Sequence, residues 1–196
     1  MFHTLRKIVI VLFFLICSGA AVGVGAVVYA KRAVFDPIMV YLEVRKLPKA
    51  PGALEEISGQ VVKTMNDYSL QLKDDRRLLS NFRLVGLAPL DQKRMTNETE
   101  LVLQDGIETR FRQLVLSNQV RVRVSYLNAQ RTGLGLVYTG TTNVNVTLVQ
   151  EGLAKVKREF LHGLPRIEQY ALVRAEHKAR ERKLGLWKEG ENSPNP

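Results

Sequence analysis

Two hydrophobic patterns follow one another along the chain. The stretch from Ile8 to Ala30 carries no charged side chain, whereas from about Leu54 onward apolar residues recur in short groups between polar ones. A helix of about 20 apolar residues crosses the hydrocarbon core of a bilayer, and the uncharged stretch is long enough to form one. The pairs Arg6-Lys7 and Lys31-Arg32 flank it, and such cations suit lipid headgroups. The first pattern therefore predicts a membrane helix, and the second predicts a globular domain.

A cleaved secretory signal peptide is the alternative interpretation of the N-terminal segment. Its basic start suits a signal, but the apolar run is longer than the core of a typical signal, which favours an anchor. Small residues spaced along the predicted helix favour close packing against another helix in the membrane. The alternative is that glycine is simply common in membrane helices. The small residues in question are Gly19, Gly23, Ala26 and Ala30.

The later pattern predicts about five short strands. In Val120–Val124 valine and arginine alternate strictly, so the valines should face a core and the arginines should face outward. Asn66-Asp67 is a predicted turn between the two apolar stretches of Ser58–Leu72. Further strands are expected in Asn81–Leu87 and Gly133–Tyr138.

Three helices are predicted between and after these strands. Apolar residues recur at helical spacing in Gly106–Asn118, Asn143–Leu153 and Pro165–Lys183. The last of these begins at a proline, which is favourable in the first turn of a helix. About five short strands with about three helices fit an α+β fold built on a small closed barrel of the oligonucleotide/oligosaccharide-binding (OB) type.

The expected domain organisation follows from these elements. Residues 1–7 form an N-terminal flank, 8–30 the membrane helix, 31–53 a juxtamembrane segment and linker, 54–188 the barrel domain and 189–196 a C-terminal tail. Prolines in residues 31–53 prevent a long helix there. A spacer is the favoured interpretation of this segment, and a short amphipathic helix around Ile38–Val44 is the alternative.

Composition narrows the chemistry and the class of partner. The chain has one cysteine, Cys17, and three histidines, which argues against a disulfide framework, a cysteine-based zinc site and a histidine-rich metal centre. Its formal net charge is +10. Such an excess favours an anionic partner, which leaves nucleic acid, anionic lipid and an acidic protein face open.

Three motifs in this order resemble the staphylococcal nuclease-like (thermonuclease) family. They are Phe82–Pro89 (FRLVGLAP), Gly133–Val156 (GLGLVYTGTTNVNVTLVQEGLAKV) and the segment from Ala175-Glu176 to Leu184-Gly185-Leu186-Trp187. The resemblance covers about Ser58 to Lys188. It implies a five-stranded OB-type barrel with about three helices.

The resemblance also implies a phosphodiesterase site, which this sequence does not preserve. The family uses carboxylates to hold calcium, a glutamate as base and two arginines. Of these, Arg83 is retained. Tyr68 stands where the first metal aspartate is expected, with Asp67 one position away, and Leu90 stands at the glutamate position.

Two further positions of the implied site are also altered. The second metal aspartate is missing from the loop after Gly86, and Thr132 replaces the second arginine, with Arg131 one position earlier. We therefore expect no enzyme activity, no metal and no cofactor.

The sequence favours a non-catalytic, membrane-anchored domain that serves as an accessory or scaffolding subunit of a membrane complex. Its partners would be membrane lipids and other subunits, and nucleic acid is not expected. The preferred location is the mitochondrial inner membrane, where respiratory-chain complexes carry single-span subunits of this kind.

Two alternatives stay open. One is a membrane-tethered nucleic-acid-binding module, and the other is a calcium-dependent nuclease with displaced site residues. The residues that could contact an anionic partner are Arg121, Arg123, Lys155, Lys157 and Arg158.

Overall fold

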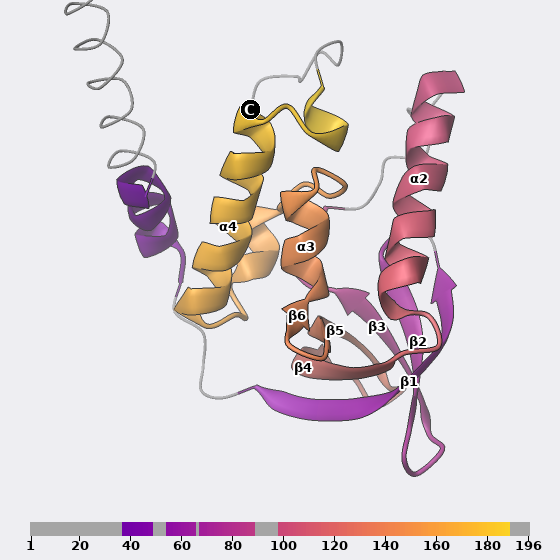
Figure 1. Cartoon of the computed structure of the whole chain (residues 1–196). Coiled ribbons are helices and arrows are strands. Elements are labelled where there is room, and N and C mark those ends of the chain that lie inside the picture. Colours follow the sequence, from indigo (N-terminus) through magenta and orange to yellow (C-terminus); the bar gives the residue numbers. More distant parts are fainter. Residues whose placement is uncertain (1–36, 49–53, 66, 89–97, 189–196) are drawn as a thin grey trace, which may run out of the picture. The chain divides into compact units, whose positions relative to one another are not determined.

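The computed structural model describes residues 37–48, 54–65, 67–88 and 98–188 (Figure 1). The chain divides into two compact units, Met1–Leu42 and Glu43–Pro196, and all strands of the described residues lie in the second. Among the described residues, no helix is long and apolar enough to cross a membrane. The predicted membrane helix at 8–30, with Gly19, Gly23, Ala26 and Ala30, lies outside the described residues.

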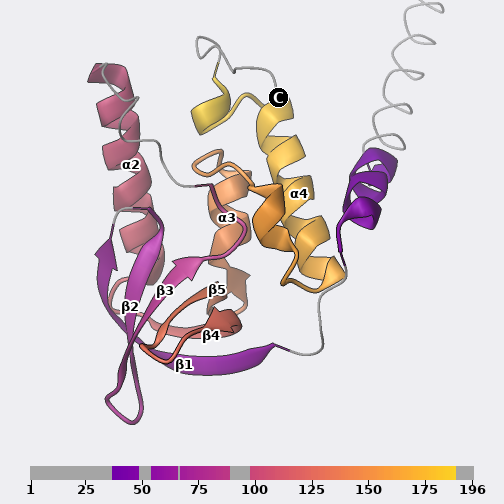
Figure 2. The ribbon, with the colours of Figure 1, turned by 180° about the vertical axis from the view of Figure 1, so that it is seen from behind.

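Five strands close into a mixed barrel, which confirms the predicted α+β fold (Figures 1 and 2). The sheet order is β3-β2-β1-β4-β5-β6, and a parallel pairing of β3 with β5 closes the barrel. The very short β6 extends β5 as a hairpin. The strands are β1 (Glu55–Met65), β2 (Ser69–Asp74), β3 (Leu79–Leu84), β4 (Gln119–Leu127), β5 (Thr132–Thr139) and β6 (Thr142–Asn143).

The alternation in β4 sorts its side chains as predicted. Val120, Val122 and Val124 are buried, whereas Arg121 is exposed and Arg123 is half-buried. Large side chains from the neighbouring strands fill the barrel interior with them, because alternate residues of a strand point to the same face. The fully buried ones include Leu70, Leu72, Phe82, Leu84 and Val137.

The helices lie where the sequence predicts them, with different ends. They are α2 (Glu98–Val115), α3 (Val144–Gln150) and α4 (Arg166–Glu181), with short 3-10 turns η1 (Arg158–Leu161) and η2 (Gly185–Trp187). Helix α2 begins before the predicted Gly106. Helix α4 ends before the predicted Lys183, whose φ of 52° is left-handed.

The predicted strand Asn81–Leu87 is also displaced. It begins at Leu79 and ends at Leu84, because the chain turns at Val85-Gly86, where Gly86 has a φ of 82°. Leu87 then forms an isolated bridge with Val156. This turn carries the chain from the barrel toward the segment that follows α3.

Two glycines join the ends of α3 and α4. The Leu186 amide donates a 2.8 Å hydrogen bond to the Gly152 carbonyl. A Cβ at Gly152 would lie 2.2 Å from the Leu184 carbonyl oxygen, and a Cβ at Gly185 would lie 2.3 Å from the Gly152 carbonyl oxygen. Both glycines have left-handed φ values. The second and third sequence motifs therefore meet through main-chain contacts that leave no room for a side chain.

Residues 37–46 form a helix at the positions of the predicted short amphipathic helix, and its place beside a membrane stays a prediction. From Glu43 onward it belongs to the same unit as the barrel. Glu43 Oε1 lies 2.6 Å from Arg158 Nε, and Glu43 Oε2 lies 3.1 Å from His177 Nε2. The Gln169 side-chain amide donates a 3.2 Å hydrogen bond to the Pro48 carbonyl. The second half of this helix is thus fixed to α4 and to the segment before it.

Candidate functional site

Arg83 lies on the outer side of the barrel, at the centre of the site that the sequence points to. It alternates with the buried Phe82 and Leu84, and its cross-strand neighbours are Ser69 on β2 and Leu134 on β5. Its Nε lies 3.9 Å from Asp67 Oδ2. Its Nη2 is buried and has no hydrogen-bond partner among the described residues. The guanidinium therefore keeps one unsatisfied donor that is enclosed by the protein.

Tyr68, which the resemblance aligns with the first metal aspartate, is part of the core. Its side chain is buried, and its hydroxyl donates a 2.6 Å hydrogen bond to the Leu153 carbonyl. Its ring meets the edge of the Phe111 ring, with 6.3 Å between centroids. Burial raises the pKa of the Tyr68 phenol above its ordinary value. The group is thus neutral at physiological pH and cannot serve as a calcium ligand.

Asp67 does not restore the missing carboxylate site. Asp67 and Tyr68 both have left-handed φ values, 67° and 59°, and the Asp67 carboxylate turns toward Arg83. The described residues contain no group of three or more His, Cys, Asp or Glu side chains that could hold a metal ion. Calcium takes six to eight oxygen ligands from carboxylates, carbonyls and waters, and of these Asp67 offers one carboxylate beside Arg83. Leu90 lies outside the described residues.

Arg131, one position before Thr132, does not replace the second arginine of the implied site. Thr132 opens β5 opposite Asn81. Arg131 Nε donates a 2.7 Å hydrogen bond to Ser80 Oγ, and its Nη2 lies 3.0 Å from Asp74 Oδ2. Arg131 thus binds the base of the β2–β3 hairpin, whereas Arg83 lies farther along the paired strands, opposite Leu134. The two guanidinium groups do not form a pair.

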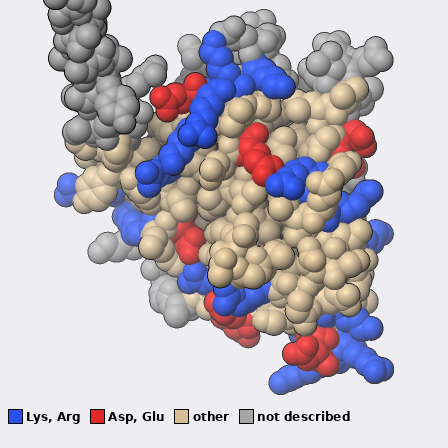
Figure 3. All heavy atoms as spheres, in the orientation of Figure 1, with Lys and Arg blue, Asp and Glu red and all other residues tan. Residues whose placement is uncertain are grey.

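Each of the five basic residues that could meet an anionic partner already has an interaction within the chain. Arg121 and Arg123 lie 3.8 and 3.6 Å from the Glu56 carboxylate, and Arg121 also lies over the Tyr138 ring. Lys155 lies over the Trp187 ring, Lys157 lies 3.3 Å from Glu159, and Arg158 binds Glu43 and Glu176. Their contact with a partner stays a prediction. Figure 3 shows lysine and arginine gathered along α4, and elsewhere mixed with acidic residues.

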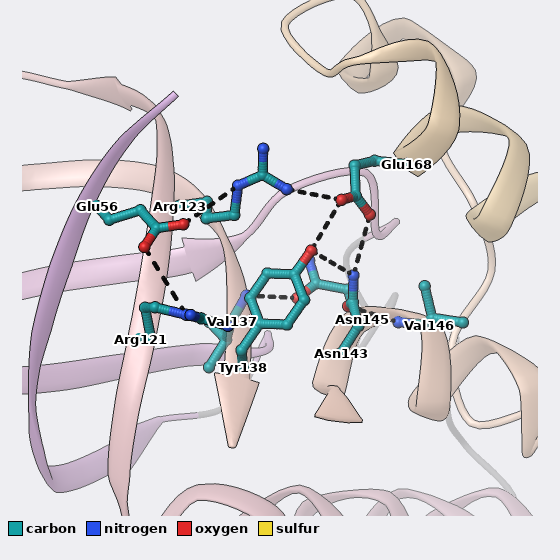
Figure 4. Close-up of polar contacts among 9 residues, drawn as sticks. All are labelled: Glu56, Arg121, Arg123, Val137, Tyr138, Asn143, Asn145, Val146 and Glu168. Carbon is teal, nitrogen blue, oxygen red and sulfur yellow. Dashed lines mark hydrogen bonds and ion pairs between the residues drawn. The ribbon is translucent and has the colours of Figure 1, made fainter. Parts of the chain in front are cut away.

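A polar network that the sequence analysis missed joins the barrel to α3 and α4 (Figure 4). Glu168 of α4 lies 2.7 Å from Arg123 and accepts a 2.9 Å hydrogen bond from the Tyr138 hydroxyl. The Asn143 side-chain amide donates to both Tyr138 and Glu168, and its oxygen caps α3 by accepting from the Val146 amide. Burial, with the hydrogen bond to Glu168, raises the pKa of Tyr138 against the opposing effect of Arg123.

Two buried polar side chains give the family motifs their structural role. Asn145 accepts from the Val137 amide and donates to the Val85 carbonyl. Glu176, 1% exposed, accepts from the Val156 amide at 2.7 Å and binds Arg158 at 2.8 Å. Their sequence positions, Val-Asn at the start of one helix and Ala-Glu within another, could have indicated such roles.

An exposed aromatic residue lies in the same cross-strand row as Arg83. Tyr126 of β4 pairs with Leu134 of β5, which pairs with Arg83 of β3. An irregularity in β4 between Val124 and Tyr126 turns the tyrosine outward, and 59% of it is exposed. Residues directly opposite one another share a face of the sheet, so a ring and a guanidinium lie on one outer surface of the barrel.

Comparison with known proteins agrees with this geometry. Residues 81–189 match the family model described as "Staphylococcal nuclease homologue". The chain is also similar to "Ribonuclease TUDOR 1" of Arabidopsis thaliana, with 34% identity over 89 residues, which is 43% of this chain and 9% of that protein. The chain thus spans less than a tenth of the length of this relative. Since the family match extends over more than half of its residues, the chain belongs to the staphylococcal nuclease homologue family.

Proposed function

We propose that this chain is a non-catalytic member of the family, tethered to a membrane, that acts as an accessory or scaffolding subunit of a membrane protein complex. The absence of catalysis is inferred from the environment of Tyr68. A buried, neutral side chain bonded to the Leu153 carbonyl stands where a metal-binding carboxylate is expected. The uncharged run from Ile8 to Ala30 supports the tether. The proposed location is the mitochondrial inner membrane, with a respiratory-chain complex as the proposed kind of assembly.

The contacts of the arginines support the same proposal. Hydrolysis of a phosphodiester needs cations around the oxygens on which negative charge develops. Arg83 is in place, but Arg131 is bound to Asp74 and Ser80. One guanidinium beside one carboxylate can attract a phosphate without hydrolysing it.

A nuclease assay on the full chain in mild detergent tests the absence of catalysis. DNA and RNA, single- and double-stranded, are incubated with calcium or magnesium, and we expect no cleavage above that of a denatured sample. Asp91 follows Leu90 and is a remaining carboxylate of that loop, so Arg83→Ala and Asp91→Asn are the informative variants. Cleavage that a chelator abolishes, and that either variant removes, would overturn the proposal.

Purification in mild detergent tests the scaffolding role. We expect the chain to elute with other membrane proteins, in a particle far larger than the 22.1 kDa chain and its detergent. Elution from native membranes as a free monomer, at several detergent strengths, would argue against an accessory subunit.

A second candidate function is binding of single-stranded nucleic acid without cleavage. The specific observation in its favour is the row that contains Tyr126 and Arg83, because an exposed ring stacks on bases and a guanidinium contacts phosphate. The relative named as a ribonuclease makes RNA the strand to test first. Binding should weaken with salt and with Tyr126→Ala, but not with Ile167→Ala, a matched exposed apolar position on α4. Absence of binding at low salt removes this candidate.

A further inference from the structure

The helix formed by residues 37–46 exposes an unusual number of large apolar side chains. Ile38 is 46% exposed, Met39 56%, Tyr41 58% and Leu42 44%. These are four of the ten large apolar residues that are exposed in the described part of the chain. A helix in a water-exposed position ordinarily turns such residues toward a core. This apolar surface therefore needs a partner.

Cations lie on the same side of this helix. Arg45 and Lys46 are exposed. At 100° per residue, Arg45 falls between Tyr41 and Ile38 on the helix surface, and Lys46 falls between Leu42 and Met39. Apolar side chains interspersed with long cationic ones are typical of helices that lie in a membrane interface, where the stems are buried and the charges reach lipid phosphates.

The remaining side of the helix is already occupied. Val44 is buried, and Glu43 binds Arg158 and His177. The Arg166 guanidinium donates to the Val44 main-chain carbonyl. The barrel unit thus holds the second half of the helix by this side. The side with Leu42, Arg45 and Lys46 is left to another partner.

The length of chain before the helix limits how far it can lie from the predicted membrane segment. The segment Lys31–Asp36 connects Ala30 to the helix. At a maximum of about 3.3–3.6 Å per residue, that segment spans roughly 20 Å. The headgroup layer on each side of a bilayer is about 5–7 Å thick, so a membrane segment that ends at Ala30 would let the helix begin no more than about 15 Å beyond the headgroups.

We infer that helix 37–46 lies on the surface of an anionic membrane. Ile38, Met39 and Leu42 reach the boundary between headgroups and acyl chains, and Arg45 and Lys46 contact lipid phosphates. This inference rests on the proposed membrane tether. Because Glu43 binds Arg158 within the barrel unit, the contact of Arg45 and Lys46 with lipid phosphates would bring that unit to the membrane surface.

Fluorescence quenching by spin-labelled lipids tests this contact in the full chain. In a Cys17→Ser background, Leu42→Cys carries an environment-sensitive fluorophore, and Tyr126→Cys carries it at a matched exposed site of the barrel. The protein is reconstituted in phosphatidylcholine vesicles with about 30% phosphatidylglycerol. Shallow nitroxide lipids should quench the probe at position 42 about threefold more than the one at position 126. Equal quenching overturns the inference.

The charge contribution is tested with the double variant Arg45→Glu/Lys46→Glu. Its probe at position 42 should lose most of the excess quenching, and the wild-type excess should shrink at high salt or in vesicles of phosphatidylcholine alone. If position 42 instead crosslinks to a protein and is not quenched by lipid, its partner is a protein and the inference is wrong.

Extraction with alkaline carbonate separates the lipid contact from the tether on which it rests. A chain that stays in the membrane while position 42 is unquenched overturns the lipid contact and leaves the tether intact. A chain that carbonate releases overturns the tether, whereas the lipid contact is then judged by the quenching at position 42 alone.

Discussion

Replacing Asn145 by leucine should destabilise the domain more than the same replacement of a half-buried asparagine of the barrel. Its side-chain oxygen accepts from the Val137 amide at 3.0 Å, and its side-chain nitrogen donates to the Val85 carbonyl at 2.9 Å and to the Gly135 carbonyl at 3.3 Å. Asn145 is 0% exposed, so water cannot take over these contacts. Leucine has a similar shape and removes all three.

The magnitude depends on the groups that lose their partner. The Gly135 carbonyl still accepts from the Val85 amide at 2.9 Å, so the Val137 amide and the Val85 carbonyl carry the cost. An unsatisfied buried group costs about 1–3 kcal/mol, which gives about 2–6 kcal/mol for the two. This is a large fraction of the about 5–15 kcal/mol by which domains are stable.

Urea unfolding of the unit from Glu43 to Pro196 measures this cost, with the single tryptophan, Trp187, as the fluorescent probe. With a slope of about 2 kcal/mol/M, the midpoint should fall by about 1–3 M. The matched control is Asn81→Leu, because Asn81 is only half-buried and contacts Gln71. It should change stability by no more than about 0.5 kcal/mol. Equal small shifts for both variants would refute the role assigned to Asn145.

Three further predictions use the same unfolding assay. Gly152→Ala should cost at least about 2 kcal/mol, because φ is 73° and a Cβ would lie 2.2 Å from the Leu184 carbonyl oxygen. Tyr68→Phe should cost about 1–2 kcal/mol through the lost hydrogen bond of its buried hydroxyl. The pKa of Glu43 lies below its ordinary value of 4.5, since hydrogen bonds from Arg158 and His177 outweigh the raising effect of burial. Glu43 therefore contributes stability above that pH which is lost as pH falls through the lowered pKa, and Glu43→Gln should flatten this acid dependence. A variant that keeps the wild-type pH profile would contradict it.

The barrel could be predicted because its strands carry strong local patterns. In β4 the alternation of valine and arginine fixes which side chains face the core, and a register slip would reverse them all. The start of α2 could not be found in this way. Val102 in its first half is 68% exposed, and the buried series begins only at Ile107. Gly106 resembles a helix boundary in the sequence, yet it lies in the middle of the helix with open space around it.

The interactions of the charged residues could not be predicted, because they depend on distant partners. Arg123 and Glu168 are 45 positions apart in the sequence, and Arg158 and Glu43 are 115 apart. The sequence alone does not show that these arginines bind carboxylates, so they resemble residues that are available to a nucleic acid. Only the closed fold brings their carboxylates within hydrogen-bond distance.

The contacts of Tyr68 give this position a structural role in the fold. A position that had only lost its metal ligand would need no more than a small polar residue at a turn. Tyr68 instead joins the turn before β2 to the segment after α3, through the Leu153 carbonyl, and to α2 through the Phe111 ring. An aspartate restored there would be buried away from water, beside apolar groups, at a cost of several kcal/mol. Tyr68 thus supports the fold through both contacts, and we expect Tyr68→Asp to destabilise the domain.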